Sequence, residues 1–141
     1  MSCNVMIVDD SLSMRAVIKK ILKLSGFDVD VCYEAQNGRE ALAVLAESWV
    51  DVIITDLNMP EMDGIEMIKT LQADDLYRRI PVVVVSTEAS RERMDEVLRL
   101  GARAFMKKPF LPEELRNTLQ TVLGFKDGVY GGGGEGEEGD F

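Results

Sequence analysis

The sequence of 141 residues contains no histidine. Catalytic triads with a histidine base, zinc sites with imidazole ligands and phosphohistidine intermediates are therefore excluded within these residues. There are only two cysteines, Cys3 and Cys32, and their spacing is not that of a metal-binding motif. We expect two free thiols in or near the core. Any chemistry must then depend on carboxylates, hydroxyl groups, lysine and a hard cation.

The sequence also lacks a long apolar segment. Nothing in it approaches the roughly 18 apolar residues that a membrane-spanning helix needs, and the N-terminal residues do not resemble a signal peptide. The 25 acidic residues outnumber the 16 lysines and arginines, so the net charge is −9. An excess of negative charge disfavours binding to a phosphate backbone. We therefore expect a cytoplasmic protein that neither inserts into a membrane nor binds nucleic acid.

Short apolar runs alternate with segments of helical periodicity. The runs predict buried strands over 5–8, 29–33, 50–55, 81–86 and 102–106. A helix follows each strand, and the first has an apolar face made of Met14, Val17, Ile18, Ile21 and Leu22. Candidate caps and ends for the helices are Ser13, Gly26, Asn37, Gly64, Ser90, Gly101 and Pro112. Strict alternation predicts a doubly wound α/β fold, with a five-stranded parallel sheet and five helices.

The last sixteen residues differ in composition from the rest of the chain. Residues 126–141 hold seven glycines and five acidic residues but one lysine. Such a segment has too little apolar surface to form a core of its own. We therefore expect a single domain over residues 1–125 followed by a flexible, glycine-rich acidic tail.

Polar residues come directly after the predicted strands. Asp9 and Asp10 follow the first, Asp56 the third and Lys108 the fifth, while Ser86 ends the fourth. In a parallel sheet these positions share one edge, which is where ligands bind in such folds. Three neighbouring carboxylates repel one another, and a hard divalent cation such as Mg²⁺ compensates their charge.

Such a site suits phosphoryl transfer. An ionised carboxylate is a competent nucleophile toward phosphorus, so no general base is required. A divalent cation, the Lys108 ammonium and the Ser86 hydroxyl can each neutralise one oxygen of the transferred group. Each residue also has a purely structural alternative: Asp9 and Asp10 can cap a helix, and Ser86 can satisfy a backbone group.

Four segments, in this order, carry a family resemblance: VDDSLSMR, DLNMPEMDG, VVVVSTEA and GARAFMKKPF. Over about residues 3–125 the sequence resembles the receiver domains of two-component response regulators, in particular the single-domain chemotaxis (CheY-like) type. The resemblance implies a flavodoxin-like sheet with strand order 2-1-3-4-5. It also implies a stand-alone signalling phosphoprotein of a phosphorelay, which is not an enzyme beyond its own phosphorylation and dephosphorylation.

The resemblance further assigns roles in phosphorylation. Asp56 is the implied phosphoacceptor. Asp10, Asp56 and the backbone carbonyl of Asn58 are the implied ligands of Mg²⁺, for which Mn²⁺ can substitute. Asp9 is expected to act on the metal through a water molecule.

A second set of residues is implied to switch conformation. Ser86 would move toward the phosphoryl group, Lys108 would pair with it after a cis bond to Pro109, and Phe105 would turn inward. The sequence leaves open whether Phe105 is such a switch or simple core. Two residues beside the site are expected to modulate it, Thr87 and Glu88.

The implied partners are a histidine kinase as phosphoryl donor and a protein target. The target would bind a monomer on the face made by the fourth helix, fifth strand and fifth helix. Two other functions compete with this one. A phosphatase is disfavoured because Asn58 stands where a second aspartate would act as general acid, and a never-phosphorylated scaffold is disfavoured by the intact acidic set.

Overall fold

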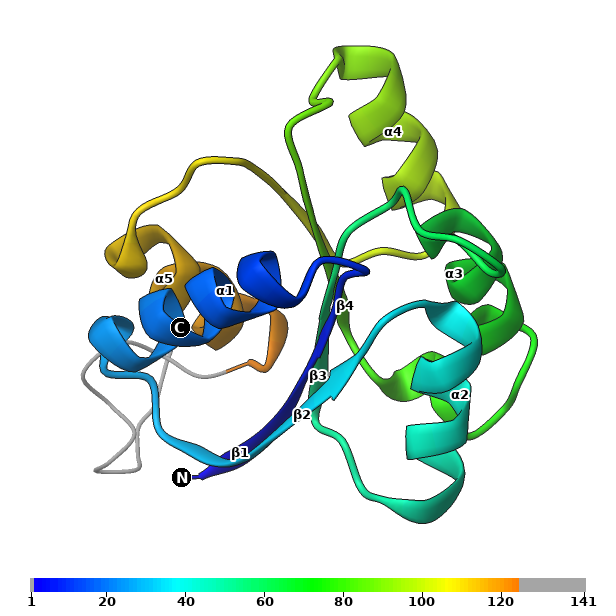
Figure 1. Ribbon diagram of the computed structural model, residues 1–141. Coiled ribbons are helices and arrows are strands. Elements are labelled where there is room, and N and C mark those ends of the chain that lie inside the picture. The colour runs from blue at the N-terminus through cyan, green and yellow to red at the C-terminus, as the bar shows by residue number, and fades with distance from the viewer. Residues whose placement is uncertain (1, 125–141) are drawn as a thin grey trace.

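A computed structural model describes residues 2–124 and shows strands and helices in alternation (Figure 1). The expected tail over 126–141 lies outside the described residues. Among residues 2–124, no helix combines the length and apolarity that crossing a bilayer would require. The elements are β1 (Cys3–Val8), α1 (Leu12–Ser25), β2 (Val29–Ala35), α2 (Gly38–Glu47), β3 (Val52–Thr55), α3 (Gly64–Gln72), a 3₁₀ turn (Tyr77–Arg79), β4 (Val82–Ser86), α4 (Arg91–Leu100), β5 (Ala104–Lys107) and α5 (Pro112–Val122).

The strands form one parallel sheet in the order β2-β1-β3-β4-β5. Helices α1 and α5 cover one face, and α2, α3 and α4 cover the other (Figure 1). Both the predicted fold class and the implied strand order are therefore confirmed. The carboxyl ends of all five strands lie at a single edge, as parallel pairing requires.

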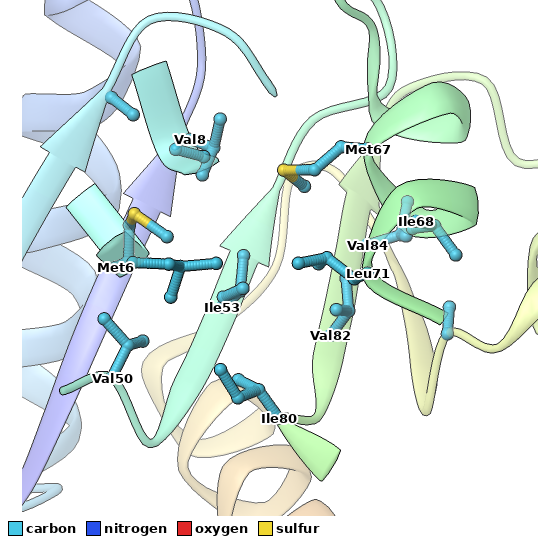
Figure 2. Close-up of a cluster of buried hydrophobic side chains, with 14 of the residues drawn as sticks. Met6, Val8, Val50, Ile53, Met67, Ile68, Leu71, Ile80, Val82 and Val84 are labelled. Atoms are coloured by element: carbon cyan, nitrogen blue, oxygen red, sulfur yellow. The ribbon is translucent and has the colours of Figure 1, made fainter. Parts of the chain in front are cut away.

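Side chains along the central strands alternate between two buried clusters. Figure 2 shows the cluster beneath α2 and α3, where Met6 and Ile53 of the sheet lie opposite Met67 and Leu71 of α3. The other cluster lies beneath α1 and α5. The four valines of β4 alternate between the two clusters, which confirms that this strand is buried on both faces. Burying each such side chain contributes about 1.5–3 kcal/mol, so the sheet is a firm support for groups at its edge.

Several predicted boundaries are wrong by a few residues. Helix α1 is capped by Ser11 and not by Ser13, because the Ser11 hydroxyl accepts the amide of Met14 at 3.1 Å. Strand β3 starts at Val52, and the carboxylate of the preceding Asp51 accepts the Asn4 amide at 2.8 Å. Strand β2 extends to Ala35, and β5 starts only at Ala104. The 3₁₀ turn was not predicted.

The remaining helix signals are confirmed. The side chains of Asn37 and Ser90 accept amides in the first turns of α2 and α4. Gly26 ends α1 with φ 78°, a left-handed conformation that glycine adopts without steric cost. Val17, however, is 49% exposed, so the apolar face predicted for the first helix is wider than the face that α1 buries.

Candidate functional site

Two strand ends bring the three predicted acidic residues together. Asp9 and Asp10 follow β1, and Asp56 follows the adjacent β3. The Asp56 amide donates to the Val8 carbonyl at 2.9 Å, which continues the ladder to the end of both strands. One carboxylate oxygen from each of the three aspartates lies within 4.8 Å of the others. The predicted convergence at this edge is confirmed.

Asp9 is held from several sides and is only 2% exposed. Its amide donates to the Ala35 carbonyl of β2 at 3.0 Å. Its Oδ1 accepts the Ser11 amide at 2.9 Å, and its main-chain carbonyl accepts Nη1 of Arg15 at 2.7 Å. Asp9 is thus fixed, whereas Asp10 beside it is exposed.

Asp56 lies in a half-buried position between the two other carboxylates and a lysine. Burial raises the pKa of Asp56, and the negative charges of Asp9 and Asp10 act in the same direction. A hydrogen bond from the Leu57 amide to Oδ1, 2.8 Å long, and the Lys108 ammonium oppose this rise in pKa. Positive charge nearby favours the ionised, nucleophilic form of this carboxylate.

Gly64 allows the backbone of the Asp56 loop to turn back closely. A Cβ at Gly64 would come to 2.5 Å from the Asp56 carbonyl oxygen and 3.0 Å from the Leu57 Cα. The Gly64 amide donates to the Leu57 carbonyl at 2.9 Å. Glycine at the start of α3 is thus required by close packing against the loop that carries Asp56.

Lys108 supplies the positive charge of the site. Its Nζ lies 3.4 Å from Oδ2 of Asp9 and 3.9 Å from Oδ2 of Asp56, and the side chain is largely buried. The peptide bond between Lys108 and Pro109 is cis, as the resemblance implied. Lys107, one position earlier, is exposed.

Ser86 is 1% exposed at the last position of β4. Its hydroxyl accepts the Glu88 amide at 3.0 Å, so the expected structural role of this hydroxyl is present. Phe105 on β5 pairs with Val84 of β4 and is only partly buried, against the cluster beneath α2 and α3. Its place is compatible with either alternative, core residue or movable ring.

The other predicted residues come shortly after the ends of β3 and β4. Asn58, Thr87 and Glu88 are exposed. Glu88 lies 3.5 Å from the guanidinium of Arg93 on α4.

Arg15 contacts the site but is not among the residues predicted from the sequence. It is buried at a helical position in register with Ile18 and Leu22, and it contacts both Asp9 and Glu34. The available signal was its spacing, because a charged residue three and seven positions before core residues faces the sheet.

The donor set fits a hard divalent cation. Three carboxylates at such short separation repel each other, and oxygen ligands from carboxylates and backbone carbonyls are those that Mg²⁺ takes. The free thiols of Cys3 and Cys32 lie on β1 and β2, away from the carboxyl ends of those strands. The site is therefore one of carboxylates, a lysine and a hydroxyl.

Known proteins are similar to this chain in sequence and fold. Residues 5–120 match the family model of the response regulator receiver domain. Chemotaxis protein CheY1 of Helicobacter pylori J99 is 39% identical over 125 residues, covering 88% of this chain and 99% of that protein. A CheY homologue of Campylobacter jejuni is 40% identical over 126 residues, covering 89% and 95%.

The comparison of structures agrees with that of sequences. The chemotaxis response regulator CheY4 of Vibrio cholerae superposes with a TM-score of 0.74 at 39% identity, covering 86% of this chain and 99% of that one. The sheet of the chain described here has five strands in the order β2-β1-β3-β4-β5. The chain therefore belongs to the response regulator receiver family and is of the CheY-like type.

Proposed function

We propose that this protein is a stand-alone response regulator that accepts a phosphoryl group on Asp56 from a histidine kinase and then changes its binding to a protein target. The observation that carries the proposal is the position of Asp56, beside Asp9 and Asp10 and 3.9 Å from the ammonium of Lys108. The similarity to chemotaxis proteins over nearly their whole length favours a role in chemotaxis or motility control. The compartment would be the cytoplasm and the form a monomer.

The proposed transfer requires little acid–base chemistry of this chain. An oxygen of the Asp56 carboxylate bonds to phosphorus as the bond from phosphorus to the donor imidazole nitrogen breaks. The electron pair of that bond stays on the nitrogen, and the ring leaves neutral when its other nitrogen carries a proton. Because these 141 residues contain no histidine, the donor imidazole lies outside them.

Asp10, Asp56 and the backbone carbonyl of Asn58 would hold Mg²⁺, or Mn²⁺ in its place, and Asp9 would act through a water molecule. When bound, the ion neutralises the carboxylates and one oxygen of the phosphoryl group. Lys108 would pair with a second oxygen, for which its ammonium, now shared between Asp9 and Asp56, is suitably placed. Both charges act where negative charge accumulates in the transfer.

The proposed switch begins at Ser86. Its hydroxyl accepts the Glu88 amide, so turning toward a phosphoryl oxygen exchanges one hydrogen bond for another and releases the loop before α4. Phe105 lies on the strand adjacent to β4 and would occupy the space that this loop vacates. The target would bind the α4–β5–α5 face, whose shape these two movements change. Thr87 and Glu88 would tune access to the phosphoryl group.

Intact mass after incubation with acetyl phosphate tests the proposal. We expect one phosphoryl adduct per chain that depends on Mg²⁺ and is absent from Asp56→Asn. An adduct that persists in Asp56→Asn would overturn the assignment of the acceptor. Failure to bind either a phosphoryl group or beryllofluoride would overturn the proposed function as a whole.

The same reaction separates a receiver from a hydrolase. A receiver takes up one group and releases phosphate from its own aspartyl phosphate. A hydrolase acting on outside substrates would turn over many equivalents of phosphomonoester. We expect no release of phosphate from a generic phosphomonoester above the rate seen with Asp56→Asn.

A further inference from the structure

Arg15 is a charged residue on the buried face of α1. It is 8% exposed and lies in register with Ile18 and Leu22, which pack on the sheet. Burial of a charged group is costly unless the group is paired and hydrogen-bonded. Arg15 therefore has to be explained by its partners.

The guanidinium joins three elements. Its Nη1 donates to the main-chain carbonyl of Asp9 at 2.7 Å, just past β1. Its Nε donates to Oε1 of Glu34 on β2 at 2.8 Å. The other oxygen of Glu34 accepts Nζ of Lys19 at 3.0 Å. The planar fork of an arginine can hold two acceptors in fixed directions, which a lysine cannot.

The contact with Asp9 bears on the position of Asp10. The carbonyl of Asp9 belongs to the peptide group that links Asp9 to Asp10, and that group is planar. Fixing its oxygen fixes the plane from which the Asp10 side chain leaves the backbone. Within residues 2–124 the Asp10 carboxylate has no hydrogen bond of its own, so its direction depends on this plane.

The acidic cluster needs such support. Carboxylate oxygens of Asp9, Asp10 and Asp56 lie within 4.8 Å of one another and repel. This repulsion favours a rotation of the backbone that moves the Asp10 carboxylate away from the other two. The charge of Arg15 is itself balanced by Glu34, so Arg15 acts on the cluster mainly through the hydrogen bond to the Asp9 carbonyl.

We propose that Arg15 is a positioning residue for the divalent-cation site: anchored to β2 by Glu34, it holds the Asp9–Asp10 peptide so that the three carboxylates converge. The inference rests on the proposed function, in which these residues bind Mg²⁺. It assigns the edge strand β2 and helix α1 a part in metal binding although neither contributes a ligand.

Four variants test it. Arg15→Met removes both hydrogen bonds and should raise the dissociation constant for Mg²⁺ about tenfold, the loss typical of groups that orient metal ligands. Arg15→Lys should have a magnesium affinity between those of Arg15→Met and wild type, since the single nitrogen of an ammonium does not reproduce the fixed directions in which the guanidinium reaches its two acceptors. Glu34→Gln should lose less magnesium affinity than Arg15→Met, because Arg15 keeps its hydrogen bond to the Asp9 carbonyl. Lys19→Met is the matched control: Lys19 contacts Glu34, does not contact Asp9, and is 47% exposed.

Calorimetric titration with magnesium chloride measures the affinity directly. Thermal unfolding in EDTA and in excess magnesium chloride gives a second readout, because a ligand of the native state raises the melting temperature in proportion to its binding free energy. A merely structural role of Arg15 would lower the melting temperature equally in both buffers. If Arg15 positions the site, the rise in melting temperature that magnesium causes should be smaller in Arg15→Met than in wild type. In Lys19→Met this rise should be unchanged.

The outcomes are distinct. An unchanged magnesium affinity and an unchanged rise in melting temperature in Arg15→Met, with a normal wild type, would overturn the positioning role and leave the proposed function intact. If Lys19→Met lost as much magnesium affinity as Arg15→Met, the loss would be due to surface charge, and the positioning role of Arg15 would also be overturned. A wild type that binds no magnesium would overturn the proposed metal site, and the role of Arg15 with it.

Discussion

The amide of Lys108 donates a 2.9 Å hydrogen bond to the main-chain carbonyl of Ser86, so the last residue of β4 and the first residue after β5 are joined backbone to backbone. The two groups proposed to contact the phosphoryl group, a hydroxyl and an ammonium, therefore share one rigid frame. Their side chains can respond to the occupancy of Asp56 while the backbone stays in place.

Lys108→Ala should separate metal binding from the switch. The variant removes the ammonium shared by Asp9 and Asp56, and loss of one such electrostatic contact should slow adduct formation from acetyl phosphate at least about tenfold. We expect magnesium binding to persist, because the three carboxylates remain. Amide shifts on α4 and β5 that beryllofluoride induces, measured by nuclear magnetic resonance, should be lost.

Lys107→Ala is the matched control, since Lys107 is exposed next to Lys108. It should match wild type in the rate of adduct formation and in the amide shifts that beryllofluoride induces. A full beryllofluoride response in Lys108→Ala would show that Lys108 does not couple the site to the α4–β5–α5 face.

Ser86→Ala should cost stability as well as switching. Removing the hydroxyl leaves the Glu88 amide without its acceptor, a loss of about 1 kcal/mol in the free energy of unfolding. Ser86→Thr keeps the hydroxyl and should retain the beryllofluoride response. Urea denaturation measures the first effect, and equal stability of wild type and Ser86→Ala would contradict it.

Gly64→Ala should disturb the Asp56 loop. Its Cβ would meet backbone atoms of Asp56 and Leu57, which cannot yield cheaply, so we expect a loss of about 1–3 kcal/mol in unfolding free energy. Adduct formation should fall in parallel. Gly38→Ala, at the first position of α2, is the comparison: there a Cβ would meet chiefly the flexible end of Met62. The prediction fails if Gly38→Ala loses more unfolding free energy than Gly64→Ala.

The pair formed by Glu34 and Arg15 should make stability depend on pH. Hydrogen bonds from Arg15, then from Lys19, hold the pKa of Glu34 below its ordinary value of 4.5. A carboxyl whose pKa is lower in the folded state stabilises the fold above its unfolded pKa, and this contribution is lost as pH falls through the folded value. The difference in unfolding free energy between wild type and Glu34→Gln should therefore be constant near neutral pH and shrink below about pH 4.5. A difference that grows on acidification would contradict this sign.

The two thiols should react slowly in the folded protein. Burial raises the pKa of both Cys3 and Cys32, which keeps them protonated near neutral pH. Because the thiolate is the reactive form, modification by Ellman's reagent at pH 7 should be much slower in buffer than in urea. Rapid labelling of Cys32 in buffer would show that its partial exposure outweighs the effect on its pKa.

Much of the fold and of the site follows from the sequence by local rules. Apolar runs such as the valines of β4 can only be satisfied by burial on both faces, and this requires a parallel sheet between two layers of helices. Boundaries such as those of β3 and β5 were less well predicted. They depend on which backbone groups find a partner in the ladder, as the bond between Asn4 and Asp51 illustrates.

The sequence by itself determined that Asp9, Asp10, Asp56, Ser86 and Lys108 would meet, because each follows or ends a strand and parallel strands end at one edge. Only the tertiary structure decided that Arg15 binds Asp9 and Glu34, and that Val17, on the predicted apolar face, is exposed. Periodicity reports the direction of a side chain within its own helix. The neighbour that receives it, here β2 beside β1, is set by the packing of segments distant in sequence.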